Sequence, residues 1–81
     1  MPYSTFELLA ATDRQIERSK LRAQRQMLRL EWFERAQLTA SAKRTRIGLD
    51  QTLGELAFLN RYRLTLYHEL AFADPPLKKA S

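Results

Sequence analysis

A seven-residue repeat of apolar and small side chains runs through the first half of the chain. Its members are Leu9, Ile16, Ala23 and Leu30, with Thr12, Ser19, Met27 and Phe33 at the alternate positions. Such a repeat predicts a long helix that packs on another helix along one face. Several members are small or polar, so we expect the helices to approach closely and to bury little area per layer.

A second repeat of the same period predicts a second long helix. Its members are Ala42, Thr45, Leu49, Thr52, Leu56, Leu59, Arg63, Leu66 and Leu70. Residues 3–74 contain no proline and are dominated by residue types that favour helix. We therefore expect an all-α protein: an antiparallel, coiled-coil-like two-helix hairpin over residues 1–73, with helices at about 5–36 and 40–72. Pro75 and Pro76 predict a flexible C-terminal tail over 74–81.

The start of the first helix has a local signature. Ser4 and Glu7 have the spacing of a capping box, in which each side chain accepts a hydrogen bond from the other residue's backbone amide. Tyr3 and Leu8 have the spacing of a hydrophobic staple over that cap. We therefore expect the first helix to begin directly after Ser4.

The position of the turn has two solutions. Gly48 and Asp50 have the residue types of a helix end and a new helix start. A turn near residue 38, with Thr39 or Ser41 as the next N-cap, leaves the second repeat unbroken and gives two arms of nearly equal length. The unbroken repeat favours the turn near residue 38.

A turn near residue 38 fixes which residues face each other, because their numbers then sum to about 76. The expected neighbours are Phe6 with Leu70, Leu9 with Leu66, Ile16 with Leu59, and Met27 with Leu49. Arg63 is the outlier in the second repeat, and the same sum places it opposite Asp13. Either these two form an ion pair, or Arg63 extends to solvent beside Tyr62 and Tyr67.

The composition argues against catalysis. The 81 residues include no cysteine and one histidine, which excludes disulfides and leaves too few ligands for a zinc or iron–sulfur site. The helical neighbours of His68 are Leu64, Thr65, Ala71 and Phe72, which form no arrangement of nucleophile, base and orienting group, and the chain contains no glycine-rich phosphate loop. We expect His68 to be a surface residue and the protein to be non-catalytic, with no cofactor, metal or small-molecule substrate.

A second apolar stripe lies away from the predicted helix–helix contact. It comprises Ile47, Phe58, Tyr62 and Phe72 of the second helix and Leu21, Leu28 and Trp32 of the first. Exposed aromatic residues in a line mark a contact surface, so these seven residues form the predicted partner interface. We expect either a homodimer that pairs two hairpins into a four-helix bundle, with Gly54 allowing close approach, or docking on another protein. The alternative is that these side chains remain exposed or fold back under the N-terminal segment.

Arginines occupy the other face of the first helix. The candidate polyanion-binding residues are Arg14, Arg18, Arg22, Arg25, Arg29, Lys43, Arg44 and Arg46. Residues 14–46 hold ten Lys and Arg against three Glu, within a formal charge of +5. Only Glu31 and Arg35 have the order that favours an ion pair within a helix, and Trp32 is the only aromatic neighbour of the stripe. The stripe therefore binds nucleic-acid phosphates, or it is a solvated face or a docking site for an acidic protein.

The segments Arg14-Gln15-Ile16, Arg25-Gln26 and Thr39-Ala40, followed by a leucine-rich second arm, resemble small uncharacterised proteobacterial helical-hairpin proteins over about residues 12–66. The resemblance implies an antiparallel hairpin and carries no activity or residue role.

The sequence thus predicts a small interaction or adaptor protein that self-associates or joins a larger assembly. The alternative is a small basic nucleic-acid-binding protein. No stretch is long and apolar enough to cross a bilayer, and the N-terminus lacks the pattern of a secretory signal. We therefore expect a cytoplasmic location and no membrane partner.

Overall fold

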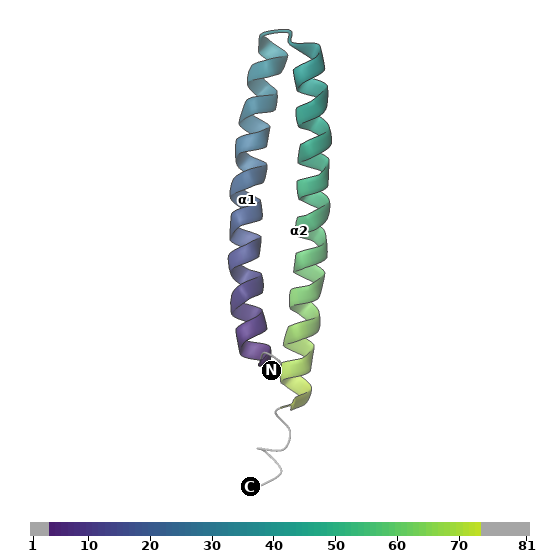
Figure 1. Cartoon of the computed structure of the whole chain (residues 1–81). Coiled ribbons are helices and arrows are strands. Elements are labelled where there is room, and N and C mark those ends of the chain that lie inside the picture. The colour runs from purple at the N-terminus through teal and green to yellow at the C-terminus, as the bar shows by residue number, and fades with distance from the viewer. Residues whose placement is uncertain (1–3, 74–81) are drawn as a thin grey trace, which may run out of the picture.

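The computed structural model describes residues 4–73, which form two long helices lying side by side in opposite directions (Figure 1). Helix α1 spans Thr5–Arg35 and helix α2 spans Thr39–Ala73. Their 31 and 35 residues correspond to about 46 and 52 Å at 1.5 Å per residue. The predicted antiparallel helical hairpin is confirmed. The expected staple at Tyr3 and the tail over 74–81 lie outside the described residues.

Helix α1 begins at a capping box, as its sequence predicts. The backbone amide of Glu7 donates to Oγ of Ser4 at 3.1 Å, and the amide of Ser4 donates to Oε1 of Glu7 at 2.8 Å. These two bonds satisfy amides that no carbonyl within the helix can reach. The carboxylate of Glu7 also lies near the positive end of the helix dipole.

The chain turns at residues 36–38, the position that the unbroken repeat favours, and Gly48 lies inside α2. The amide of Leu38 donates to the carbonyl of Phe33 at 2.9 Å, and the amide of Gln37 donates to that of Glu34 at 3.1 Å. This pair of bonds is a Schellman motif, which requires a left-handed residue just after the helix. Gln37 fills that position with φ of 59°, where glycine is the usual choice.

The residues that face the partner helix repeat every seven positions in both helices. The buried side chains are Leu9, Thr12, Ile16, Ser19 and Ala23 of α1 and Ala42, Leu49, Thr52 and Leu66 of α2. The most deeply buried large side chains are Ile16, at 1 % exposure, and Leu66, at 2 %. We call this line of contact between α1 and α2 the seam. It holds more small and hydroxyl-bearing side chains than large apolar ones.

Two expected seam contacts are wrong. Met27 is 55 % exposed, and the half-buried residue at this level is Gln26, seven residues after Ser19. The seven-residue spacing places Gln26 rather than Met27 in the contact, because rotating α1 to bury Met27 would turn Ile16 and Ala23 away from α2. Phe6 is 72 % exposed, so it does not bury itself against Leu70 at the open end.

The ion pair that the register predicts is present. Nη1 of Arg63 lies 3.3 Å from Oδ1 of Asp13, and Nη2 of Arg63 donates to Oδ1 of Asn60 at 3.2 Å. The residue numbers of Asp13 and Arg63 sum to 76, as a turn near residue 38 requires. The pairing also satisfies a cation that occupies an otherwise apolar seam position.

Polar seam residues find partners within the hairpin, with one exception. The hydroxyls of Thr12 and Thr52 donate to carbonyls four residues earlier in their own helices, at 2.7 and 3.1 Å. The hydroxyl of Ser19 crosses the seam and donates to Oε1 of Glu55 at 2.8 Å. Oε1 of Gln26 is buried and has no hydrogen-bond partner in the described part of the chain. The seam therefore contains one unsatisfied polar atom opposite Gly48, where an added Cβ would lie 3.3 Å from Nε2 of Gln26.

Candidate interaction surfaces

A hairpin of two helices has two long sides, one on each flank of its seam. On the first, Nη1 of Arg22 lies 3.3 Å from Oε1 of Glu55. One heptad toward the open end, Gln15 and Tyr62 line a common hollow, as the register requires. Stepping by heptads from Arg22 and Arg18 in α1, and from Glu55 and Phe58 in α2, gives the positions of this flank, which we call the arginine side. Its charged and aromatic members are Arg18, Arg22, Arg25, Arg29 and Trp32 of α1, and Arg44, Glu55, Phe58, Tyr62, Glu69 and Phe72 of α2.

The opposite flank is defined by Nη2 of Arg46, 2.6 Å from Oε2 of Glu34. One heptad from that pair in each helix, the register places Met27 across from Leu53. We call this flank the paired-charge side. It comprises Asp13, Lys20, Met27 and Glu34 of α1, and Arg46, Leu53, Leu64 and Tyr67 of α2.

The hairpin leaves more large apolar side chains exposed than it buries. In residues 4–73, six apolar residues are buried, two of them alanines, and thirteen large ones are exposed. The seven residues of the predicted partner interface are all exposed. Trp32, Phe58, Tyr62 and Phe72 lie on the arginine side, whereas Leu21, Leu28 and Ile47 lie on the outer backs of the two helices. Their role as an interface stays a prediction.

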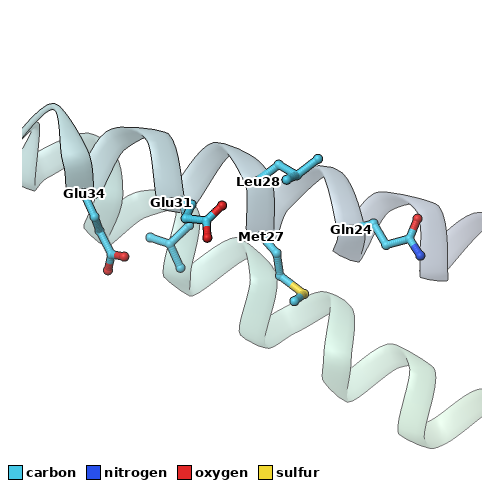
Figure 2. Close-up of a pocket in the computed structure, with 6 residues that line it drawn as sticks. Gln24, Met27, Leu28, Glu31 and Glu34 are labelled. Atoms are coloured by element: carbon cyan, nitrogen blue, oxygen red, sulfur yellow. The ribbon is translucent and has the colours of Figure 1, made fainter.

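Sequence reasoning missed the apolar residues of the paired-charge side. Met27, Leu53, Leu64 and Tyr67 are exposed there. Met27 also lines an open hollow of about 550 Å³ with Gln24, Leu28, Leu30, Glu31 and Glu34. Figure 2 shows Met27 directed toward α2 and Leu28 on the far side of α1. Writing both repeats as heptads would have revealed this group, because residues 27 and 53 occupy equivalent flanking positions of the two helices.

Acidic residues on the paired-charge side are matched by bases. Asp13 and Glu34 pair across the seam with Arg63 and Arg46. On the same flank of α1, Glu17 and Glu31 lie 3.4 Å from Lys20 and 3.6 Å from Arg35, respectively. Sequence reasoning found the Asp13–Arg63 pair from the register and the Glu31–Arg35 pair from its spacing. It missed Glu34–Arg46, which joins the two helices near the turn, and Glu17–Lys20 within α1. Little net charge is left where Met27 and Leu53 are exposed.

The arginine side keeps its positive charge. Only Arg22 pairs there, with a carboxylate shared by Ser19. Within residues 4–73, no carboxylate oxygen lies within 4.0 Å of the guanidinium groups of Arg18, Arg25, Arg29 or Arg44. Arg18, Arg25 and Arg29 are exposed and line one open hollow of about 510 Å³ together with Leu21, Arg22 and Gln26.

Aromatic residues of α2 share this side with the arginines. The rings of Phe58 and Tyr62 are nearly parallel, with centroids 6.4 Å apart and an interplanar angle of 3°. They line a hollow of about 240 Å³ with Leu8, Ala11, Thr12, Gln15 and Leu59. Trp32 contacts Phe33 edge-on at the turn end of the same side. Besides Trp32, the aromatic neighbour expected from sequence, the hairpin therefore brings Phe58 and Tyr62 of α2 to the side that carries the arginines.

His68, the single histidine of the chain, lies on the surface of the hairpin. His68 is exposed and stacks near Phe72, with ring centroids 6.5 Å apart. No group of three His, Cys, Asp or Glu side chains in residues 4–73 is placed to hold a metal ion. Neither α1 nor α2 contains a stretch apolar enough to cross a membrane.

Comparison with known proteins adds no family. The chain matches no protein-family model, no curated protein and no solved structure. The resemblance to proteobacterial hairpin proteins stays a prediction.

Proposed function

We propose that the protein is a non-catalytic interaction module in which two hairpins associate into a four-helix bundle. One observation supports this most strongly: thirteen large apolar side chains of the described region are exposed against six buried apolar residues. Burying apolar surface is worth roughly 25 cal/mol per Å², so a second copy that covers the exposed side chains of one side adds a favourable term. A side about 46 Å long and roughly 20 Å wide offers roughly 900 Å², close to the roughly 800 Å² per partner of a stable interface.

The paired-charge side fits a second copy better than the arginine side. Its exposed Met27, Leu53 and Tyr67 lie among ion pairs that already neutralise its charges. Two copies meeting through their arginine sides would bring guanidinium groups that lack carboxylate partners into a contact of low dielectric, where charge repulsion is strongest. The competing interface is the second apolar stripe predicted from sequence, which comprises seven residues and is centred on Phe58.

Size measurement in solution tests the proposal. We expect the full chain, of 9.5 kDa, to sediment as a dimer of about 19 kDa at micromolar concentration. Leu53→Asp places a charge at the proposed contact and should shift the equilibrium to the monomer. Phe58→Asp places the same charge on the arginine side, and Gln51→Asp is a control at an exposed polar position. Both should leave the dimer intact.

Helicity and thermal unfolding separate loss of pairing from loss of fold. Because only the folded chain associates, the thermal midpoint of the wild type should rise with protein concentration. The proposal fails if the wild type is a well-folded monomer with a concentration-independent midpoint. If Phe58→Asp dissociates the dimer and Leu53→Asp does not, the interface lies on the arginine side and our choice of side is wrong.

A further inference from the structure

The arginines of α1 form a concentrated cationic surface. Arg14 and Arg18, Arg18 and Arg22, and Arg25 and Arg29 are each four residues apart, and like charges at this spacing destabilise a helix. Over 15 residues they extend about 22 Å along the axis at 1.5 Å per residue. Among the ion pairs of residues 4–73, only Glu55 pairs with one of these five arginines, Arg22. Asp13, Glu17, Glu31 and Glu34 all pair with other bases.

The cationic residues of this stripe are all arginines. A guanidinium group offers a planar fork of donors that matches two oxygens of one phosphate, whereas lysine acts as a point charge. A surface that only had to remain hydrated could use either residue. Lys20 occurs on the paired-charge side, where it is matched by a glutamate.

Aromatic rings lie along the same side. Phe58, Tyr62 and Trp32 are exposed, and Phe58 and Tyr62 present nearly parallel rings toward the open end. Unpaired bases stack on exposed aromatic rings whatever their sequence, while bases inside a duplex are not available for this. Guanidinium forks beside exposed rings therefore match both parts of a single strand, its phosphates and its bases.

We propose that the arginine side binds single-stranded nucleic acid without sequence preference. Arg18, Arg25 and Arg29 contact backbone phosphates, and bases stack on Tyr62 and Phe58. This function goes beyond the proposed self-association and uses the opposite side of the hairpin, so a dimer would carry two such surfaces facing away from each other.

The salt dependence of binding measures the phosphate contacts. The probe is a single-stranded oligonucleotide, titrated into the full chain at several salt concentrations. Fluorescence of Trp32, the only tryptophan, reports binding. The logarithm of the binding constant should fall linearly with the logarithm of salt concentration, with a slope of about −0.7 per phosphate neutralised. Arg25→Gln/Arg29→Gln should make this slope shallower by about 1.4.

A matched variant controls for net charge. Lys43 is among the candidates from sequence, but the structure places it in a hollow with Glu34 and Arg46, the ion pair of the paired-charge side. Lys43 and Arg61 are both exposed, have no carboxylate within 4.0 Å in residues 4–73 and lie off the arginine side. Lys43→Gln/Arg61→Gln lowers the charge from +5 to +3, as the arginine double variant does, and should leave the slope nearly unchanged. Equal slopes for the two double variants would overturn the proposal.

Tyrosine substitutions test stacking. Tyr62→Leu keeps an apolar side chain but removes the ring, and should weaken binding about five-fold or more. Tyr67→Leu makes the same change on the paired-charge side and should have no effect. Equal effects of the two substitutions, or equal affinity for a duplex of the same length, would overturn recognition of a single strand. Equal affinity for polyglutamate would show that the surface takes acidic polymers in general and would also overturn the proposal.

Discussion

Asp13 and Arg63 are 50 positions apart in the chain, and Oδ1 of the first lies 3.3 Å from Nη1 of the second. Their side chains are 50 % and 37 % exposed, so solvent screens the pair. Exposed ion pairs contribute about 0–1 kcal/mol. Asp13 therefore marks the register of the hairpin more than it stabilises the fold.

A double-mutant cycle with Asp13→Asn and Arg63→Gln measures this pair. We expect a coupling energy below about 1 kcal/mol by urea denaturation, decreasing further in 1 M salt. A coupling of several kcal/mol would indicate a buried pair, and no coupling at any salt concentration would contradict the contact.

The turn offers a stabilising substitution. Gln37 holds a left-handed conformation that costs a residue with a Cβ about 1–2 kcal/mol, and glycine adopts it freely. Because glycine also gives the unfolded chain more freedom, we expect Gln37→Gly to raise the free energy of unfolding by about 0.5–1 kcal/mol. Leu38→Gly, at a position without positive φ, should lower it. A destabilised Gln37→Gly would mean that the glutamine side chain supports the turn.

The two glycines of α2 form a matched pair. A Cβ at Gly54 meets no atom within 4 Å, so Gly54→Ala should gain the full helix-propensity difference of about 0.8–1.0 kcal/mol. A Cβ at Gly48 meets Nε2 of Gln26 at 3.3 Å, so Gly48→Ala should gain less. Thermal or urea unfolding of both variants checks the order. Equal gains would show that the Gln26 side chain moves aside without cost.

Gln26 itself is the weakest point of the seam. Its buried Oε1 atom has no partner in residues 4–73, and an unsatisfied buried acceptor costs about 1–3 kcal/mol. We expect Gln26→Leu to stabilise the hairpin by about 1 kcal/mol or more, measured by urea denaturation. Gln24→Leu, at an exposed position of the same helix, is the control and should change little. A loss of stability in Gln26→Leu would indicate that a water molecule satisfies the amide.

The fold was predictable because its determinants are local or periodic. The Ser4–Glu7 cap lies within four residues, and the unbroken repeat through Gly48 placed the turn and the Asp13–Arg63 pair. Met27 was misplaced because its apolar character was weighed above the seven-residue spacing, which selects Gln26.

The surfaces were harder to predict, since each combines residues from both helices. Arg22 and Tyr62 are 40 positions apart in the chain. They lie on the same side of the hairpin only because of the way α1 packs against α2. Exposure of Phe58 and Tyr62 followed from their place outside the repeat. Their grouping with the arginines, and the neutralised side around Leu53, required the register of both helices together.

The uneven seam also governs how the chain folds. Contacts beside the turn close the shortest loops. The entropic free-energy cost of closing such a loop is about 1.4 kcal/mol lower than that of closing a loop five times longer. The half of the seam beside the turn buries Leu49, but it also holds Gln26, Thr45 and Gly48, whereas the two most buried large side chains, Ile16 and Leu66, lie 22 and 28 residues from Leu38. The helices therefore gain less from contacts beside the turn than from contacts farther along the seam. We expect the rate-limiting nucleus to contain the distant apolar layers, and the chain to fold more slowly than a hairpin whose strongest contacts lie next to its loop.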